Sequence, residues 1–335
     1  MLITDMSLEM FGKIFETITF WAPLRGVSLL FEARIKGCMD TPTGSTLKAH
    51  YKLNADRFNS ASQLLKPAAL AEIELHCTLY QLTSLTVSYV VGAERWPTFG
   101  EMLARNAVHL TSLNLSNTRF LIERLQPLTR LTGLTDFNLS FNRCLAHDQH
   151  LLALPTNLRS LKLDSCGMRG MGYGWATQVT CLKLLSLKGN LYRGQDGGYV
   201  PPNIHWFSQL HTLCMGNASL EVEPLAAILA NVSTTLTKLD VAYNLVGDWT
   251  TPADRAPMYT ALARLTDLTE LNLAGCHVGD SATELAAAIS AMSALKILDV
   301  TTSGLSDPLS ADNAAEIAAL EARGVRVIRQ RVALE

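Results

Sequence analysis

A short pattern of apolar residues recurs along most of the chain and constrains its fold more than any other feature. In LKLLSLKGNLY, residues 182–192, leucines stand at the first, fourth and sixth positions and Asn190 at the ninth. Leu185 and Leu187, separated by one residue, place their side chains on one face of a short strand. The Asn190 amide can hydrogen-bond backbone groups where the strand ends and the chain turns. One such unit buries only one edge, so the pattern predicts neighbouring units of the same kind.

The same spacing occurs in nine units that follow one another along the chain. Each unit has apolar residues at its first, fourth and sixth positions. Units 1 to 9 begin, in order, at Leu82, Leu110, Leu134, Leu158, Leu182, Leu210, Leu236, Leu268 and Leu295. Their period of roughly 24 to 32 residues is typical of solenoid repeats. Stacked units of this kind bury a continuous core that no single unit can form.

This array resembles the leucine-rich-repeat family from about Leu82 to the C-terminus, and its later units are similar to the ribonuclease-inhibitor type. The resemblance implies a curved α/β solenoid, with parallel strands on the concave face and with turns and helices on the convex face. Between the later strands, apolar residues at helical spacing predict helices at residues 224–232, 256–265 and 279–292.

Residues 1–80 do not follow the repeat, and we interpret them as an N-terminal helical cap in front of a repeat domain at 81–335. A solenoid needs such a cap because its first unit would otherwise expose core. The stretch 47–79 has a helix-like pattern and is assigned to the cap. Residues 5–37 are also similar to an F-box, whose short helices dock an adaptor of a ubiquitin ligase.

At the other end, residues 324–330 predict a capping strand in the position of a further unit. Gly324 can end a helix at 313–322 in the left-handed conformation, and apolar residues follow it at 325, 327 and 328. Arg326 and Arg329 interleave with these residues, which protects an edge strand from pairing with other molecules. Contact between these arginines and a partner protein is the alternative.

Composition and charge exclude several classes of protein. The chain has 335 residues and a net charge of −2, without the basic stripe that nucleic-acid binding requires. Its apolar runs fall short of the ~20 residues of a membrane span. Seven cysteines, an odd number, without paired terminal caps favour a reduced, intracellular protein. We therefore expect a cytoplasmic location, with an organelle as the alternative, and neither membrane nor nucleic acid as a partner.

The ninth position of each unit should determine how well its turn is hydrogen-bonded. Asparagine occupies it in three units, at Asn142, Asn190 and Asn244. Ala218 has no side chain that can bond, so the turn of unit 6 is predicted to be the weakest. Cys166 and Cys276 hold the same position in two distant units, which indicates core thiols rather than metal ligands.

The side chains that leave the core should form two rows across the concave face. The fifth positions give Thr86, Asn114, Asn138, Lys162, Ser186, Cys214, Asp240, Asn272 and Asp299. The seventh positions give Ser88, Ser116, Ser140, Asp164, Lys188, Gly216, Ala242, Ala274 and Thr301. Most of these side chains are small and polar, which permits close approach of a partner. Asn138, Lys162, Asp164, Lys188 and Asp240 are the candidates for partner binding.

Three tyrosines in loops beside the central units are further candidates. Tyr173 lies in a glycine-rich loop, and Tyr192 and Tyr199 lie in the loop one unit later. Stacked units bring equivalent loops side by side, and loops often carry function.

The sequence has none of the motifs that we associate with catalysis, and we predict neither a cofactor nor a metal. It favours a non-catalytic scaffold that binds other proteins, as a structural or assembly subunit of a larger intracellular complex. One alternative is a substrate receptor of an F-box ubiquitin ligase. The other is a GTPase-activating protein built on leucine-rich repeats.

Overall fold

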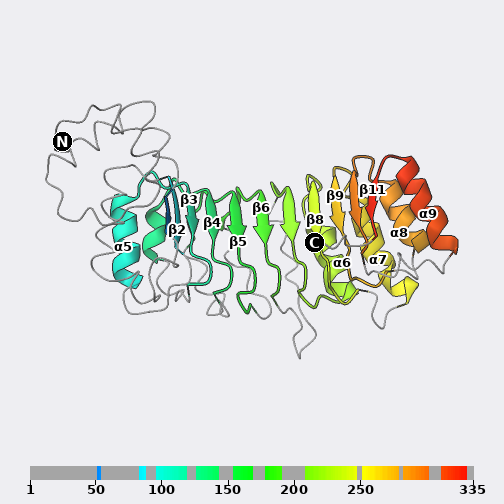
Figure 1. Cartoon of the computed structure of the whole chain (residues 1–335), viewed down its shortest axis with the longest axis horizontal. Helices are drawn as coiled ribbons and strands as arrows, with labels where there is room; N and C mark the ends of the chain where they lie inside the picture. The colour runs from blue at the N-terminus through cyan, green and yellow to red at the C-terminus, as the bar shows by residue number, and fades with distance from the viewer. Residues whose placement is uncertain are drawn as a thin grey trace, which may run out of the picture.

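The strands of the chain form one open parallel sheet (Figure 1). The computed structural model describes residues 51–53, 83–87, 96–118, 126–142, 154–168, 178–190, 208–246, 251–278, 282–301 and 311–329. The eleven strands follow sequence order: β1 (Tyr51–Leu53), β2 (Ser84–Val87), β3 (Ser112–Asn114), β4 (Asp136–Asn138), β5 (Ser160–Lys162), β6 (Leu184–Ser186), β7 (Thr212–Cys214), β8 (Lys238–Asp240), β9 (Glu270–Asn272), β10 (Ile297–Asp299) and β11 (Arg326–Ile328). Among the described residues, each strand pairs only with its neighbours in this order.

The nine predicted units supply strands β2 to β10 in the predicted register. The residue at the fourth position of each unit pairs with its equivalent in the next, beginning with Leu85, Leu113 and Phe137. These residues and the first-position leucines of units 2 to 9 are buried in one continuous core. Each buried leucine contributes about 1.5–3 kcal/mol of apolar burial. The predicted α/β solenoid of parallel strands is confirmed.

Helices accompany the strands mainly in the second half of the array (Figure 1). The segments predicted at 224–232, 256–265, 279–292 and 313–322 form α6 (Val222–Asn231), α7 (Pro252–Ala263), α8 (Ala282–Ser290) and α9 (Ala311–Ala322). Helix α7 begins four residues before the predicted start because Thr251 caps it. The Thr251 N–H donates to Asp254 Oδ2 at 2.7 Å, and the Asp254 N–H donates to Thr251 Oγ1 at 3.4 Å.

Two elements on the N-terminal side were not predicted. Helix α5 (Trp96–Asn106) follows β2 and buries Phe99 and Leu103 completely. Its sequence signal was the i, i+3, i+4 spacing of Phe99, Met102 and Leu103. A short 3₁₀ helix, η6 (Gln126–Arg130), fills the equivalent place in the shorter unit 2.

Strand β1 corrects the prediction of a helix-like segment at 47–79 for residues 51–53. These three residues pair with β2, so the sheet itself covers the edge of unit 1 there. The other residues of the predicted cap at 1–80, including the F-box-like stretch 5–37, lie outside the described residues.

At the C-terminal end, β11 pairs with β10 within the segment where a strand was predicted. Gly324 adopts the left-handed conformation, with φ of 84°, directly after α9. The Val325 N–H donates to Leu320 O at 3.1 Å, which turns the chain from the helix back into the sheet.

The prediction that the turn of unit 6 is the weakest because of Ala218 is wrong. Asn244 of unit 7 reaches back to this turn, where its Oδ1 accepts from the N–H groups of Ala218 (3.1 Å) and Leu220 (3.0 Å). Its Nδ2 donates to the carbonyls of Met215 (3.0 Å) and Val241 (2.7 Å). The turn of unit 6 therefore obtains its bonds from the following unit.

Asn142 and Asn190 act in the same way on the units before them. Asn190 Oδ1 accepts from the N–H of Cys166 at 2.9 Å, and Asn142 Oδ1 accepts from the N–H of Thr118 at 3.0 Å. The asparagines stand in units 3, 5 and 7, and each serves the unit before it. The thiol of Cys166 donates to Leu139 O, which agrees with a core thiol.

Candidate protein-interaction surface

The fifth-position side chains lie in register across the strands, as predicted. The printed pairs run from Thr86 through Asn114, Asn138, Lys162, Ser186, Cys214, Asp240 and Asn272 to Asp299. We call this side of the sheet the exposed sheet face, because the alternate side chains of the same strands enter the core.

Several polar residues of this row also hydrogen-bond the backbone where their own strands end. Asn138 Oδ1 accepts from the N–H of Ser140 at 3.0 Å, and Asp240 Oδ1 accepts from the N–H of Ala242 at 3.2 Å. This local bond occupies a backbone donor where the chain leaves the strand. The candidates Asn138 and Asp240 therefore have a structural role that the sequence reasoning missed.

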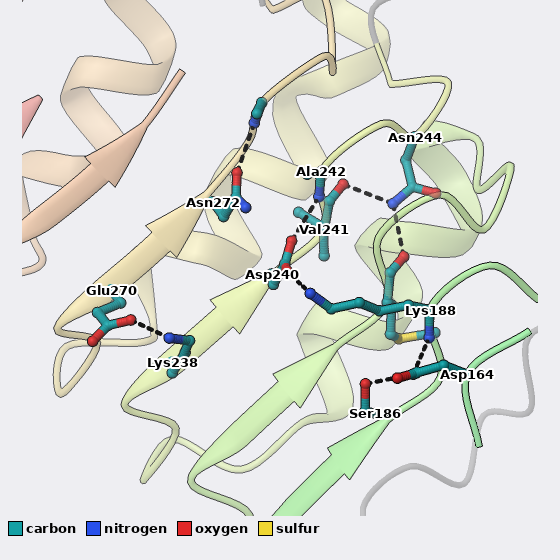
Figure 2. Close-up of polar contacts among 12 residues, drawn as sticks. Asp164, Ser186, Lys188, Lys238, Asp240, Val241, Ala242, Asn244, Glu270 and Asn272 are labelled. Atoms are coloured by element: carbon teal, nitrogen blue, oxygen red, sulfur yellow. Dashed lines mark hydrogen bonds and ion pairs between the residues drawn. The ribbon is translucent and has the colours of Figure 1, made fainter. Parts of the chain in front are cut away.

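Three of the predicted candidates meet in one polar cluster at the middle of the face (Figure 2). The ammonium of Lys188, in unit 5, forms an ion pair with Asp240, in unit 7. Asp164 Oδ1 accepts from the Ser186 hydroxyl at 2.5 Å and from the Lys188 N–H at 2.9 Å. The lysine side chain crosses unit 6, where Gly216 has no side chain at the equivalent position.

This crossing explains why part of the predicted row is buried. Ser186, Cys214 and Asp240 are 5%, 9% and 7% exposed, whereas solvent-facing positions were expected. Lys188 extends from its own unit toward Asp240, and Ser186 donates to Asp164 (Figure 2). The centre of the face is therefore already occupied by side chains of the chain itself.

Electrostatics in this cluster stabilise the charged lysine and the neutral thiol. Burial alone would lower the pKa of Lys188, but the hydrogen bond and charge of Asp240, with the charge of Asp164, raise it above the usual value. Burial is the main cause that raises the pKa of the Cys214 thiol, against an opposing effect of Lys188. A protonated thiol is a poor nucleophile, so Cys214 lacks the chemistry of a reactive cysteine.

Lys162 differs from the cluster because it is exposed and forms no ion pair with any residue that the structure describes. Further along the face, Lys238 and Glu270 of neighbouring units form an exposed ion pair (Figure 2).

Of the candidates at the C-terminal strand, Arg326 is exposed and Arg329 forms an ion pair with Glu321 of α9. Arg329 is thus engaged within the chain. Tyr173, Tyr192 and Tyr199 lie outside the described residues.

The second position of each unit forms another row, which the sequence reasoning did not consider. In four units a threonine hydroxyl donates to the backbone carbonyl of the same position in the preceding unit. These bonds are Thr111 to Thr83 (3.0 Å), Thr135 to Thr111 (3.2 Å), Thr237 to His211 (3.0 Å) and Thr269 to Thr237 (2.9 Å). Units 4, 5 and 6 have Arg159, Lys183 and His211 at this position, and all three are exposed. The signal was visible in the sequence once the second positions were aligned.

Two further observations concern sites of other kinds. Within the described ranges, no group of three or more His, Cys, Asp and Glu side chains is placed to hold a metal ion. Of the helices in these ranges, none combines the length and the apolar content that crossing a bilayer requires.

Comparison with protein families agrees with the repeat architecture. The family model of the leucine-rich repeat matches residues 232–248 and 264–282, which contain the strands of units 7 and 8. Among solved structures, internalin C2 from Listeria monocytogenes str. 4b F2365 is 19% identical, with a TM-score of 0.46, over 72% of this chain and 91% of that chain. No curated protein sequence matches the chain.

Leucine-rich-repeat proteins generally bind other proteins and are typically non-catalytic interaction modules. In this chain nine units with the repeat's apolar spacing pair in register in one parallel sheet, and two of them match the family model. The chain therefore has the architecture of a leucine-rich-repeat solenoid.

Proposed function

We propose that the chain is a non-catalytic scaffold that binds other proteins through its exposed sheet face, as a structural or assembly subunit of a larger intracellular complex. The observation that supports this best is the register of the fifth-position row, in which mostly small polar side chains lie in line on both sides of the central Lys188–Asp240 pair. Side chains of this kind allow the backbone or a helix of a partner to approach closely.

The experiment compares partner recovery by variants that block opposite sides of the molecule. Ser112→Arg with Thr212→Arg places two long side chains on the exposed sheet face, at partly exposed positions. Ala227→Arg with Ala319→Arg adds the same charge at exposed positions of α6 and α9. Each protein is used for a pull-down from native extract, and mass spectrometry identifies what is recovered.

We expect the wild type and the helix variant to recover the same proteins and the sheet variant to lose them. Equal recovery by both variants, at equal thermal stability, would contradict binding through the sheet face. Recovery of a ubiquitin-ligase adaptor as the main partner would favour the substrate-receptor alternative, and recovery of a GTPase would favour the GTPase-activating alternative.

A further inference from the structure

The row of second-position residues changes character in the middle of the array. In the units on both sides of units 4 to 6, threonine hydroxyls donate hydrogen bonds to carbonyls of the preceding unit. Arg159 and Lys183 cannot form that short bond, and their long side chains are exposed instead. His211 continues the row, with its ring oriented by donation from Nδ1 to Gln209 O at 2.7 Å. Three neighbouring units thus present basic side chains where units 2, 3, 7 and 8 present threonine hydroxyls bonded to the backbone.

These cations lack the ion-pair partners that other lysines of the array have. Arg159, Lys162 and Lys183 form no ion pair with the described residues, whereas Lys188 and Lys238 both pair with a carboxylate. Among residues 158–166, 182–190 and 210–218, Asp164 is the only carboxylate. It already accepts from Ser186 and from the Lys188 N–H. A chain with a net charge of −2 therefore has a local excess of positive charge over three adjacent units.

We propose that Arg159, Lys183 and His211, together with Lys162, form a basic strip that binds an extended acidic segment of a partner protein. This inference rests on the proposed function and names the chemistry of the partner. Neighbouring strands are about 4.8 Å apart, so the strip spans roughly 10 Å. An extended chain rises about 3.3 Å per residue and places alternate side chains roughly 6.6 Å apart on one side. Two or three carboxylates of such a segment match the strip.

The extent of the strip favours an acidic peptide over a nucleic acid. Threonine returns at the second position in units 7 and 8, and Asp136 lies exposed on the strand before unit 4. A nucleic-acid backbone would need a longer run of cations than three units supply. A short acidic segment with two or three carboxylates needs no more cations than the strip provides.

The test is direct binding of a labelled peptide to the full chain. The probe is a fluorescein-labelled octapeptide of alternating Glu and Ser, with the matching Gln and Ser peptide as the neutral control, measured by fluorescence anisotropy. Arg159→Thr with Lys183→Thr restores the residue that other units have at this position, so the fold should tolerate it. Lys296→Thr makes the same change at the exposed second position of unit 9 and serves as the matched control.

We expect the acidic peptide, and not the neutral one, to bind the wild type and the Lys296→Thr variant equally. The Arg159→Thr and Lys183→Thr variant should bind it roughly fivefold more weakly, as for the loss of two exposed charge pairs. Equal binding by all three proteins would overturn the proposal. The proposal would also be overturned if an eight-nucleotide oligothymidylate competed with the peptide, bound more tightly than the peptide, and lost its binding in the same variant.

The partner recovered from native extract separates this proposal from the proposed function. If the Ser112→Arg with Thr212→Arg variant loses that partner while the Arg159→Thr with Lys183→Thr variant retains it, the scaffold function stands and the acidic-segment proposal fails. Loss of the partner in both variants supports the proposal when that partner contains an acidic segment of the kind that the peptide represents.

Discussion

The buried asparagines at the ninth position each hold two units together. Asn244 is 2% exposed and bonds two carbonyls and two N–H groups, which belong to its own unit and to the one before. The sequence located these asparagines, but it assigned each of them only to its own turn. The direction in which a side chain reaches depends on the register between neighbouring units, which a single sequence does not contain.

Replacing Asn244 by alanine should therefore cost more than the loss of one hydrogen bond. A buried polar group without a partner costs about 1–3 kcal/mol, and three backbone groups lose theirs here, because Val241 O keeps the bond from the Cys276 thiol. We expect the free energy of unfolding to fall by about 3 kcal/mol or more, measured by urea titration. Asn157→Ala is the control, because that side chain is exposed and donates to one carbonyl, Thr132 O. Similar losses for the two variants would contradict the role of Asn244 between units.

The residue after the seventh position has a positive φ in seven units. The seven are Asn117, Phe141, Ser165, Gly189, Asn217, Tyr243 and Gly275. Glycine and asparagine suit this conformation, whereas an aromatic residue rarely adopts it. Phe141 and Tyr243 are nevertheless found there and are 56% and 43% exposed. The apolar pattern that identifies the units says nothing about this position.

Gly275→Ala should destabilise the chain for two reasons. Its φ of 67° disfavours a side chain, and a Cβ would lie 2.5 Å from Cδ1 of Tyr243. Gly324→Ala has only the first penalty, because nothing lies within 4 Å of a Cβ there, and should cost about 1 kcal/mol. We expect the larger loss of unfolding free energy for Gly275→Ala. Adding Tyr243→Asn should recover part of it, and a failure to do so would show that the ring moves aside freely.

At the scale of single elements, the sequence predicted the strands and the later helices because their apolar periods are long and regular. It missed α5, whose apolar residues Phe99, Met102 and Leu103 lie in one short stretch between strands β2 and β3. It also missed β1, since Tyr51–Leu53 lacks the spacing of the units and is placed by pairing with β2. The start of α7 depended on a capping interaction that apolar periodicity does not reveal.

The cap of α7 should make its stability depend on pH. Hydrogen bonds from the backbone and hydroxyl of Thr251 hold the pKa of Asp254 below its usual value. A lowered carboxyl pKa gives stability that is present above the unfolded-state pKa of about 4 and is lost as the pH falls through the folded-state pKa. Thr251→Ala should therefore lower the melting temperature at pH 7, and by less at pH 3.

Thr260→Ala is the control for this prediction, because Thr260 is exposed on the same helix and its hydroxyl donates to Ala256 O. It should change the melting temperature little and by the same amount at both pH values. A pH-independent loss in Thr251→Ala would mean that Asp254 contributes nothing through its charge.

At the scale of the whole molecule, the sequence predicted which residues share a row but not which of them remain available. Register alone aligned Asn138, Lys162 and Asp240. The contact between Lys188 and Asp240 spans two units and removes both from the free surface. Arg159 and Lys183 were passed over because only the fifth and seventh positions had been assigned to the face. Availability depends on long side chains that cross between units, which a pattern within one unit cannot show.

The last strand should protect the end of the array. We expect deletion of residues 324–335 to cause aggregation, because it removes β11 from β10 and uncovers Leu298 and Val300, which are 1% and 0% exposed. Size-exclusion chromatography and thermal melting would detect this change. Deletion of residues 330–335 leaves β11 in place and serves as the control. A monomeric and equally stable 324–335 deletion would show that β11 is not a cap and would turn attention to Arg326 as a partner contact.

The alternation of asparagine with smaller residues also limits how the length of this protein can be changed. An asparagine-bearing unit that is cut out alone leaves the turn before it without an acceptor, as with unit 5 and the N–H of Cys166. Removing units 4 and 5 together leaves the bonds of Asn142 to unit 2 and of Asn244 to unit 6 intact. For shortening or extending this scaffold by engineering, the natural building block is a pair of repeats.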